Sequence, residues 1–314
     1  MSSIFDGGDR IATIDLASGN FQTMPTFTDV QMSIMPLIHR FGDEFRGVGT
    51  CFAISNQGIC LTARHVIDEA FPALRGGQMG AEHGELYALY IGPPQGPDPD
   101  SPLFGGPLLV DKVHVSPDLD IAALSLRMMS NIETGEPIKM PACPLGIAPP
   151  AVGATCLAVG YHKMVWAKED ALVTVEQAFA ATRGDVEELH IPRRDSSQLT
   201  FPCFRTSAHY AGGMSGAPVF SEDGYVRGVV CSEIETGEND DYISYASLIG
   251  PSLLLILEGS DGPGQPAGQR FLADFAAGGA VRADLTGAQL RRDETACTVV
   301  IGGAAIRNQL PATA

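Results

Sequence analysis

The chain has 314 residues, a net charge of −17 at pH 7 and hydrophobic residues at 45% of its positions, with 36 glycines and 22 prolines. The acidic balance argues against nucleic-acid binding, which needs a positive footprint, and a basic cluster at 192–194 is expected to be a solvated loop tip. No apolar run approaches the roughly 20 residues of a membrane-spanning helix, so neither nucleic acid nor a membrane is an expected partner.

The glycine- and proline-rich composition favours short strands joined by turns over long helices. Residues 1–28 are polar and predict a loosely structured lead-in. The proline-rich stretch 131–150 predicts a crossover between two halves. A first barrel is predicted over 29–130, with strand-like segments at 32–38, 48–55, 59–63, 85–92 and 107–115.

A histidine follows the second strand of the hairpin predicted over 48–63. It is His65, in the sequence TARHV (62–66), where a barrel strand would lead into a short helix. A single histidine at the end of a strand is more often structural than catalytic. His65 is therefore a candidate catalytic residue only in combination with other motifs along the chain.

Two aspartates come just before the next apolar segment, 121–124. Burying a carboxylate is costly unless it is hydrogen-bonded or paired with a charge. The Nδ1–H of a histidine meets that need, and the carboxylate in turn fixes the histidine tautomer. Asp118 and Asp120 are therefore both candidates for a partner of His65.

A glycine-rich turn, GGMSGAP (212–218), places Ser215 between a polar stretch and an apolar strand. Flanking glycines permit positive φ angles and a close approach to a ligand. A serine hydroxyl beside exposed backbone N–H groups is how a nucleophile and its oxyanion hole are built together. The alternative is a β-turn that merely contains a serine. The turn lies in a second barrel predicted over 151–246, with strand-like segments at 155–161, 171–180, 186–191, 198–204, 217–220, 224–234 and 242–248.

The last part of the chain begins with a Gly/Pro-rich stretch, 259–268, which predicts a flexible linker. The tail that follows, 269–314, predicts an added strand or helix packed on the barrel, or a contact with a partner. It is too short to hold a PDZ-like module.

The seven cysteines are odd in number and scattered, with no CxxC pair, and we expect them to be reduced thiols. The N-terminus lacks the basic region and apolar core of a secretory signal, which together with the thiols predicts a cytoplasmic protein. No His/Cys cluster has metal-ligand spacing and no phosphate-binding loop is found. We expect no metal and no cofactor, which disfavours a metal or nucleotide enzyme.

Three of these stretches, TARHV (62–66), DIAAL (120–124) and GMSGAP (213–218), resemble the TAAHV-, DIALL- and GNSGGP-type motifs of trypsin-like (chymotrypsin-fold) serine peptidases. The bacterial disulfide-free type is most similar, as in an HtrA-like protease domain without a PDZ module. The resemblance implies a peptidase domain over 29–258. It implies an all-β fold of two six-stranded antiparallel β-barrels, closed by a short C-terminal helix over 247–258.

The resemblance also implies roles for individual residues. His65 would act as general base and later as general acid, Asp120 would orient it, and Ser215 would attack the scissile carbonyl. Asp120 is preferred to Asp118 because the acid of this family directly precedes the strand. The backbone N–H groups of Gly213 and Ser215 would form the oxyanion hole. Met214 replaces an aspartate that pairs with a newly cut N-terminus in many relatives, so activation by that ion pair is not expected.

The resemblance also implies a substrate pocket, with less specific residue assignments than for the triad. The pocket floor lies six residues before the nucleophile, at His209, and one wall would be the strand that carries Ser232 and Glu233. His209 would favour a polar or acidic substrate side chain, and Glu233 a basic one. The alternative is structural, with His209 packed under the loop and Glu233 in water.

These features predict a serine endopeptidase that hydrolyses proteins or peptides through an acyl-enzyme on Ser215, with His65 and Asp120 completing a triad. The alternative is a latent or non-catalytic peptidase-fold module that binds a peptide or scaffolds a complex. A regulatory partner protein would fit the latent form.

Overall fold

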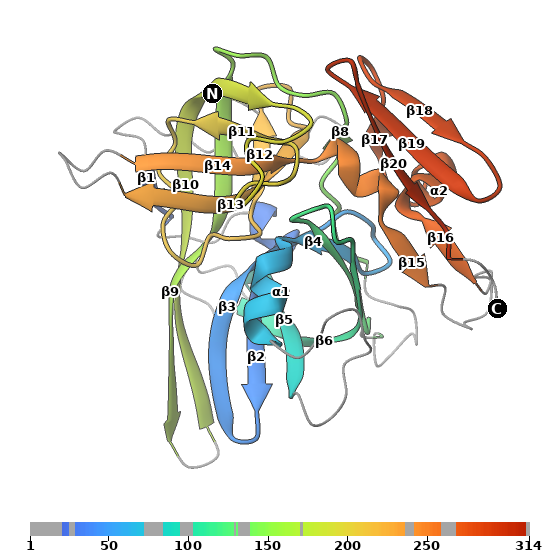
Figure 1. The fold of residues 1–314 in the computed structure, drawn as a ribbon. Coiled ribbons are helices and arrows are strands. Elements are labelled where there is room, and N and C mark those ends of the chain that lie inside the picture. The colour runs from blue at the N-terminus through green and yellow to red at the C-terminus, as the bar shows by residue number, and fades with distance from the viewer. Residues whose placement is uncertain are drawn as a thin grey trace.

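A computed structural model of the chain shows its architecture (Figure 1). The structure describes residues 21–24, 29–71, 84–94, 103–128, 130, 139–169, 172–235, 242–258 and 268–311. Two β-barrels lie one above the other, and the C-terminal segments lie beside them. No helix in these described ranges is long and apolar enough to cross a bilayer.

The first barrel closes in the order β2-β3-β4-β7-β6-β5, with every neighbouring pair antiparallel. Buried apolar residues from all six strands belong to the hydrophobic core. This barrel contains the hairpin predicted around 48–63. Its strands are β2 (Ile34–Phe41), β3 (Glu44–Ala53), β4 (Ile59–Thr62), β5 (Glu85–Pro94), β6 (Leu103–Val115) and β7 (Ala122–Leu126).

The second barrel follows the order β12-β9-β10-β11-β14-β13 and is closed by antiparallel pairing between β12 and β13. The two six-stranded barrels confirm the predicted all-β fold. The strands are β9 (Thr155–Glu169), β10 (Leu172–His190), β11 (Cys203–Thr206), β12 (Pro218–Ser221), β13 (Val226–Glu235) and β14 (Tyr242–Leu248). The β9–β10 hairpin extends down along β3 of the first barrel, where Met164 packs on Gly47 (Figure 1).

Short elements complete the barrels. The helix α1 (Arg64–Ala70) follows β4, and a 3₁₀ helix (Asp29–Met32) precedes β2. The strand β1 (Phe21–Thr23) pairs with β10, although its residues belong to the predicted lead-in. Within the stretch predicted as a crossover, β8 (Leu145–Gly146) joins β13 in parallel.

The helix predicted over 247–258 is not formed as a single element. The strand β14 runs to Leu248, a five-residue 3₁₀ helix spans Gly250–Leu254, and β15 (Ile256–Glu258) follows. All five residues of the 3₁₀ helix are buried, and Pro251 lies at its start. An apolar run without a polar face does not distinguish a helix from a buried strand, which explains the error. The short α-helix near the C-terminus is instead α2 (Leu272–Ala277).

The tail is a folded extension of the second barrel. β15 pairs with β16 (Gln269–Phe271), and β17 (Ala283–Asp284) adds a parallel strand to β8. A three-stranded sheet then forms from β18 (Gln289–Arg292), β19 (Ala296–Ile301) and β20 (Ala304–Gln309). Its buried side chains Cys297, Val299 and Ile301 belong to the main apolar core. Residues 259–267 of the predicted linker lie outside the described residues.

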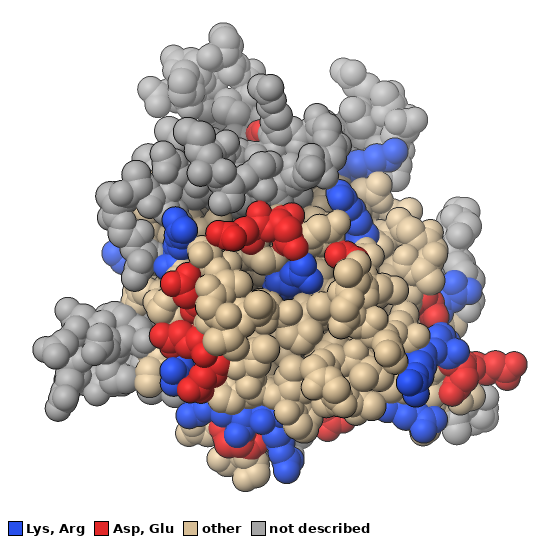
Figure 2. Space-filling model, turned by 90° about the horizontal axis from the view of Figure 1, so that it is seen from above, with Lys and Arg blue, Asp and Glu red and all other residues tan. Residues whose placement is uncertain are grey.

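The charged side chains do not form one continuous acidic surface on the face seen in Figure 2. Lysines and arginines lie beside the aspartates and glutamates, and uncharged residues separate them. Elsewhere in the structure, Arg205 Nε pairs with Glu187 at 2.8 Å, and its Nη2 lies 3.4 Å from Glu188. Acidic and basic side chains are therefore interspersed on the face that Figure 2 shows.

Candidate active site

The first barrel brings His65 and Asp120 together. Pairing of β4 with β7 sets Thr62 opposite Ala122, so the residues just outside the two strands become neighbours. The backbone N–H of His65 donates to Asp120 Oδ1 at 3.0 Å. The imidazole Nδ1 lies 2.9 Å from Asp120 Oδ2 and 3.1 Å from Oδ1. One carboxylate thus holds both the start of α1 and the histidine ring.

The two candidate acids lie in different surroundings. Asp120 is buried, with 8% of its surface exposed, and contacts His65. Asp118 is exposed at the surface. The backbone carbonyl of Asp120 also accepts the N–H of Arg64 at 3.3 Å, which anchors the aspartate to the helix start. Of the two carboxylates, Asp120 is the one that can fix the imidazole.

The pKa of His65 is raised above its ordinary value of 6.5. Burial lowers this pKa, but the hydrogen bond and the negative charge of Asp120 outweigh it, and the charges of Glu69 and Asp68 add to the effect. The imidazole remains accessible, because 40% of its side-chain surface is exposed. A basic, accessible histidine held through Nδ1 can accept a proton at its other nitrogen.

The second barrel contributes the turn that carries Ser215. Gly213 and Gly216 have φ angles of 95° and 87°, which glycine adopts without strain. A Cβ at Gly216 would lie 2.1 Å from the Thr50 carbonyl oxygen, so only glycine fits against the first barrel. Within the turn, the N–H of Ala217 donates to Met214 O at 2.8 Å.

This turn packs against the segment that carries His65. The carbonyl of Ser215 accepts the N–H of Thr50 at 2.8 Å. Gly216 faces Ala63, and a Cβ on Gly49 would lie within 3.0 Å of both the Ser215 carbonyl and the Val66 side chain. Ser215 is therefore held beside residues 62–66. Its Oγ forms no hydrogen bond with His65 Nε2 in this structure, and such catalytic hydrogen bonds are often long without a bound substrate.

Two backbone donors flank the candidate nucleophile. Among the described residues, neither the N–H of Gly213 nor that of Ser215 has an acceptor, whereas the N–H of Met214 between them donates to Ala211 O at 3.0 Å. The apolar side chain of Met214 is fully buried. The turn can thus offer two amide donors to an oxygen that gains negative charge beside Ser215.

The predicted pocket residues are placed only in part. His209 is half-buried, and its ring contacts Phe21 edge-on, with centroids 5.5 Å apart. Phe21 also contacts His162 at 5.1 Å, so β1 covers this side of the barrel. The backbones of Ser232 and Glu233 belong to β13, but their side chains lie outside the described residues.

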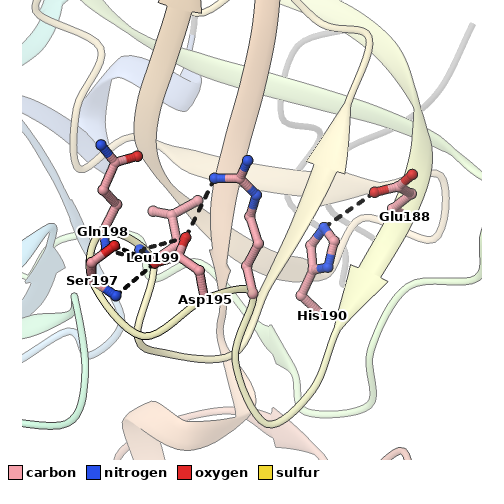
Figure 3. Close-up of polar contacts among 7 residues, drawn as sticks. Glu188, His190, Asp195, Ser197, Gln198 and Leu199 are labelled. Atoms are coloured by element: carbon pink, nitrogen blue, oxygen red, sulfur yellow. Dashed lines mark hydrogen bonds and ion pairs between the residues drawn. The ribbon is translucent and has the colours of Figure 1, made fainter.

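A polar cluster on the loop 191–199, between β10 and β11, has a structural explanation (Figure 3). The carboxylate of Asp195 accepts the backbone N–H groups of Gln198, Ser197 and Leu199 at 2.6, 2.8 and 3.2 Å. Those hydrogen bonds, with that of Gln198 the largest contribution, lower the pKa of Asp195 to about 2. The shifted pKa marks an ordered loop and is not a sign of acid–base chemistry.

The sequence-based reasoning missed Thr50 and Tyr161, which support the turn from both barrels. Thr50 Oγ1 donates to Gly213 O, and the N–H of Tyr161 donates to that same Oγ1, both at 3.1 Å. The only local signal was a hydroxyl residue inside an apolar strand. No group of three or more His, Cys, Asp or Glu side chains in the described part of the chain is arranged to hold a metal ion.

Comparison with known protein families gives one match over most of the barrel region. A family model described as a trypsin-like peptidase domain matches residues 49–229, more than half of the chain. No curated protein sequence matches the chain.

Several solved structures are similar at low sequence identity. The MamO protease domain from Magnetospirillum magneticum is 13% identical with a TM-score of 0.43, over 70% of this chain and 93% of that chain. The Rv3671c protease from M. tuberculosis, in its active form, is 16% identical with a TM-score of 0.43, over 70% and 78%. Deg5 is 18% identical with a TM-score of 0.43, over 70% and 85%.

Proposed function

Because the chain belongs to the trypsin-like peptidase domain family, we propose that it is a serine endopeptidase that cleaves peptide bonds through an acyl-enzyme on Ser215. The family indicates protein or peptide substrates. The observation that carries the proposal is the contact between His65 Nδ1 and Asp120 at 2.9 Å, beside a turn with two unused amide donors.

In the proposed reaction, His65 Nε2 takes the proton of the Ser215 hydroxyl while Oγ attacks the scissile carbonyl carbon. The carbonyl oxygen becomes an oxyanion that accepts the N–H groups of Gly213 and Ser215. The imidazolium, stabilised by Asp120, then gives its proton to the leaving amine. Water, deprotonated by His65, hydrolyses the ester and restores the Ser215 hydroxyl.

A mutation of the nucleophile tests the proposal. Ser215→Ala should abolish hydrolysis of a mixed peptide library, by up to about 10⁶-fold in kcat, with little change in stability. Ser196→Ala is the matched control, because Ser196 is exposed on a loop outside the site. Cleavage is read by mass spectrometry of the products. Undiminished turnover in Ser215→Ala would refute the assignment.

A latent form of the same enzyme is the second candidate. It is favoured by the missing hydrogen bond between Ser215 Oγ and His65 Nε2, which would then form only when a substrate or a partner protein binds. Cleavage by wild-type protein only after such a partner is added would support latency. Cleavage by the isolated chain would rule it out.

We also propose that the enzyme acts in the cytoplasm. The proposal is supported by the cysteines, since all seven lie in the described residues, are buried and form no disulfide. A fluorescent fusion found outside the cytoplasm would contradict it.

A further inference from the structure

The Thr50 hydroxyl lies between the two barrels at the candidate nucleophile. Thr50 belongs to β3 of the first barrel and is fully buried. Its Oγ1 accepts the N–H of Tyr161 from β9 at 3.1 Å and donates to the carbonyl of Gly213 at 3.1 Å. A hydroxyl has one hydrogen to donate, so accepting from an amide leaves that hydrogen for the carbonyl and fixes the rotor.

These contacts determine the orientation of one peptide group. The carbonyl of Gly213 is bound by Thr50, and the N–H of Met214, on the same peptide, donates to Ala211 O at 3.0 Å. Both ends of the Gly213–Met214 peptide are therefore anchored. The peptide groups on either side of it carry the two amide donors without acceptors, those of Gly213 and Ser215.

The anchored peptide needs external support because its conformation is not set locally. Gly213 has a φ of 95°, which is one of many backbone conformations that glycine adopts at little cost. Thr50 is itself fixed, since its carbonyl accepts the Thr62 hydroxyl at 2.7 Å and its N–H donates to Ser215 O at 2.8 Å. The hydroxyl thus connects the β3–β4 hairpin to the turn that carries Ser215.

We propose that Thr50 is a positioning residue, whose side-chain hydroxyl holds the Gly213–Met214 peptide so that the two flanking amides converge on the oxyanion. This inference rests on the proposed function, because it concerns the same transition state. The Thr50 hydroxyl touches no reacting atom. It acts by preorganising donors, which contribute to catalysis only if they need no reorganisation during the reaction.

The test compares variants by their reaction with a fluorophosphonate probe, whose phosphoryl oxygen also needs the oxyanion donors. Thr50→Val keeps the shape and removes the hydroxyl, and should lower the maximal inactivation rate about 10- to 100-fold without changing the probe's apparent dissociation constant. Thr50→Ser keeps the hydroxyl and should restore the rate. Thr182→Val is the matched control, a fully buried threonine whose hydroxyl has no partner among the described residues.

Backbone hydrogen exchange gives a readout that does not depend on activity. In Thr50→Val, the amide of Tyr161 loses its acceptor and should exchange faster, while Thr182→Val should leave it protected. The amide of Met214, on the anchored peptide, should also exchange faster in Thr50→Val. If the wild-type protein is not labelled at Ser215, the proposed function fails, and the exchange of the Tyr161 and Met214 amides still decides whether the hydroxyl holds Tyr161 and the turn.

Three results would overturn the inference. One is an equal inactivation rate in Thr50→Val and Thr182→Val, and another is a rate in Thr50→Ser as low as in Thr50→Val. The third is that Thr50→Val and Thr50→Ala both fail to fold while Thr50→Ser folds normally, which would make the hydroxyl purely structural.

Discussion

The carboxylate of Asp120 shows how burial and proposed function are linked at one residue. It is buried and accepts two hydrogen bonds from His65, one from the backbone and one from the ring. A buried charge is tolerated only with such donors. The contacts that stabilise Asp120 in the protein interior therefore also fix the tautomer of the imidazole. Asp118, two residues earlier, is exposed and is not needed for this arrangement.

A pair of matched substitutions tests which aspartate belongs to the proposed triad. Asp120→Asn should lower kcat by about 10⁴-fold, because the amide favours the wrong histidine tautomer. Asp118→Asn, which makes the same change two residues away, should leave kcat unchanged. Both are measured on one cleaved peptide from the library. Loss of activity in Asp118→Asn with retention in Asp120→Asn would reverse the assignment.

The pH profile of the same variants gives a second reading. The base must be neutral, so the activity of wild-type protein should rise with pH through a midpoint above 6.5, the direction in which Asp120 moves the pKa of His65. In Asp120→Asn, burial remains and the attracting charge is lost, so the midpoint should move to lower pH. A wild-type midpoint below 6.5 would show that Asp120 does not control the base.

The single residues differ in how far the sequence could identify them. The candidate residues His65, Asp120 and Ser215 could be named from the sequence because each lies in a short motif at the end or start of a strand. Thr50 could not, because its hydroxyl partners Gly213 and Tyr161 lie 163 and 111 residues away. Only the pairing of the two barrels brings these three residues together.

At the scale of elements, the barrel strands follow from local pattern, whereas the C-terminal segments do not. Apolar segments on either side of a turn that contains glycine predict strands such as β3 and β4 directly. The apolar run within 247–258 carries no periodicity, and its structure depends on β16, which pairs with β15. The tail, 269–314, pairs mainly with itself and with β8, contacts that no local motif indicates.

Two neighbouring valines in β19 test whether the tail is part of the folded core. Val299 is fully buried, while Val300 faces the other side of the sheet and is half-buried. Val299→Ala should reduce the free energy of unfolding by about 2 kcal/mol through lost burial and a residual cavity. Val300→Ala should cost clearly less. Urea denaturation measures both, and equal small effects would mean that this sheet does not pack on the barrel.

At the scale of the whole molecule, the family and the two-barrel fold predicted from three short motifs are confirmed. Three motifs are sufficient to predict this fold because the candidate site is built by both barrels. The order of the motifs along the chain therefore indicates the order of the strands that carry them. The substrate pocket could not be predicted in the same way. His209 lies against Phe21 of β1, a strand that the sequence did not indicate, and the side chains of Ser232 and Glu233 lie outside the described residues.

The central claim is that His65, Asp120 and Ser215 form a working nucleophile in this chain. The most direct measurement is labelling of the purified protein with a fluorophosphonate, followed by mass spectrometry to locate the adduct. The account predicts one adduct, on Ser215, that is lost in His65→Ala while the variant stays folded. Absence of labelling in wild-type protein, or labelling of Ser215 that persists in His65→Ala, would contradict it.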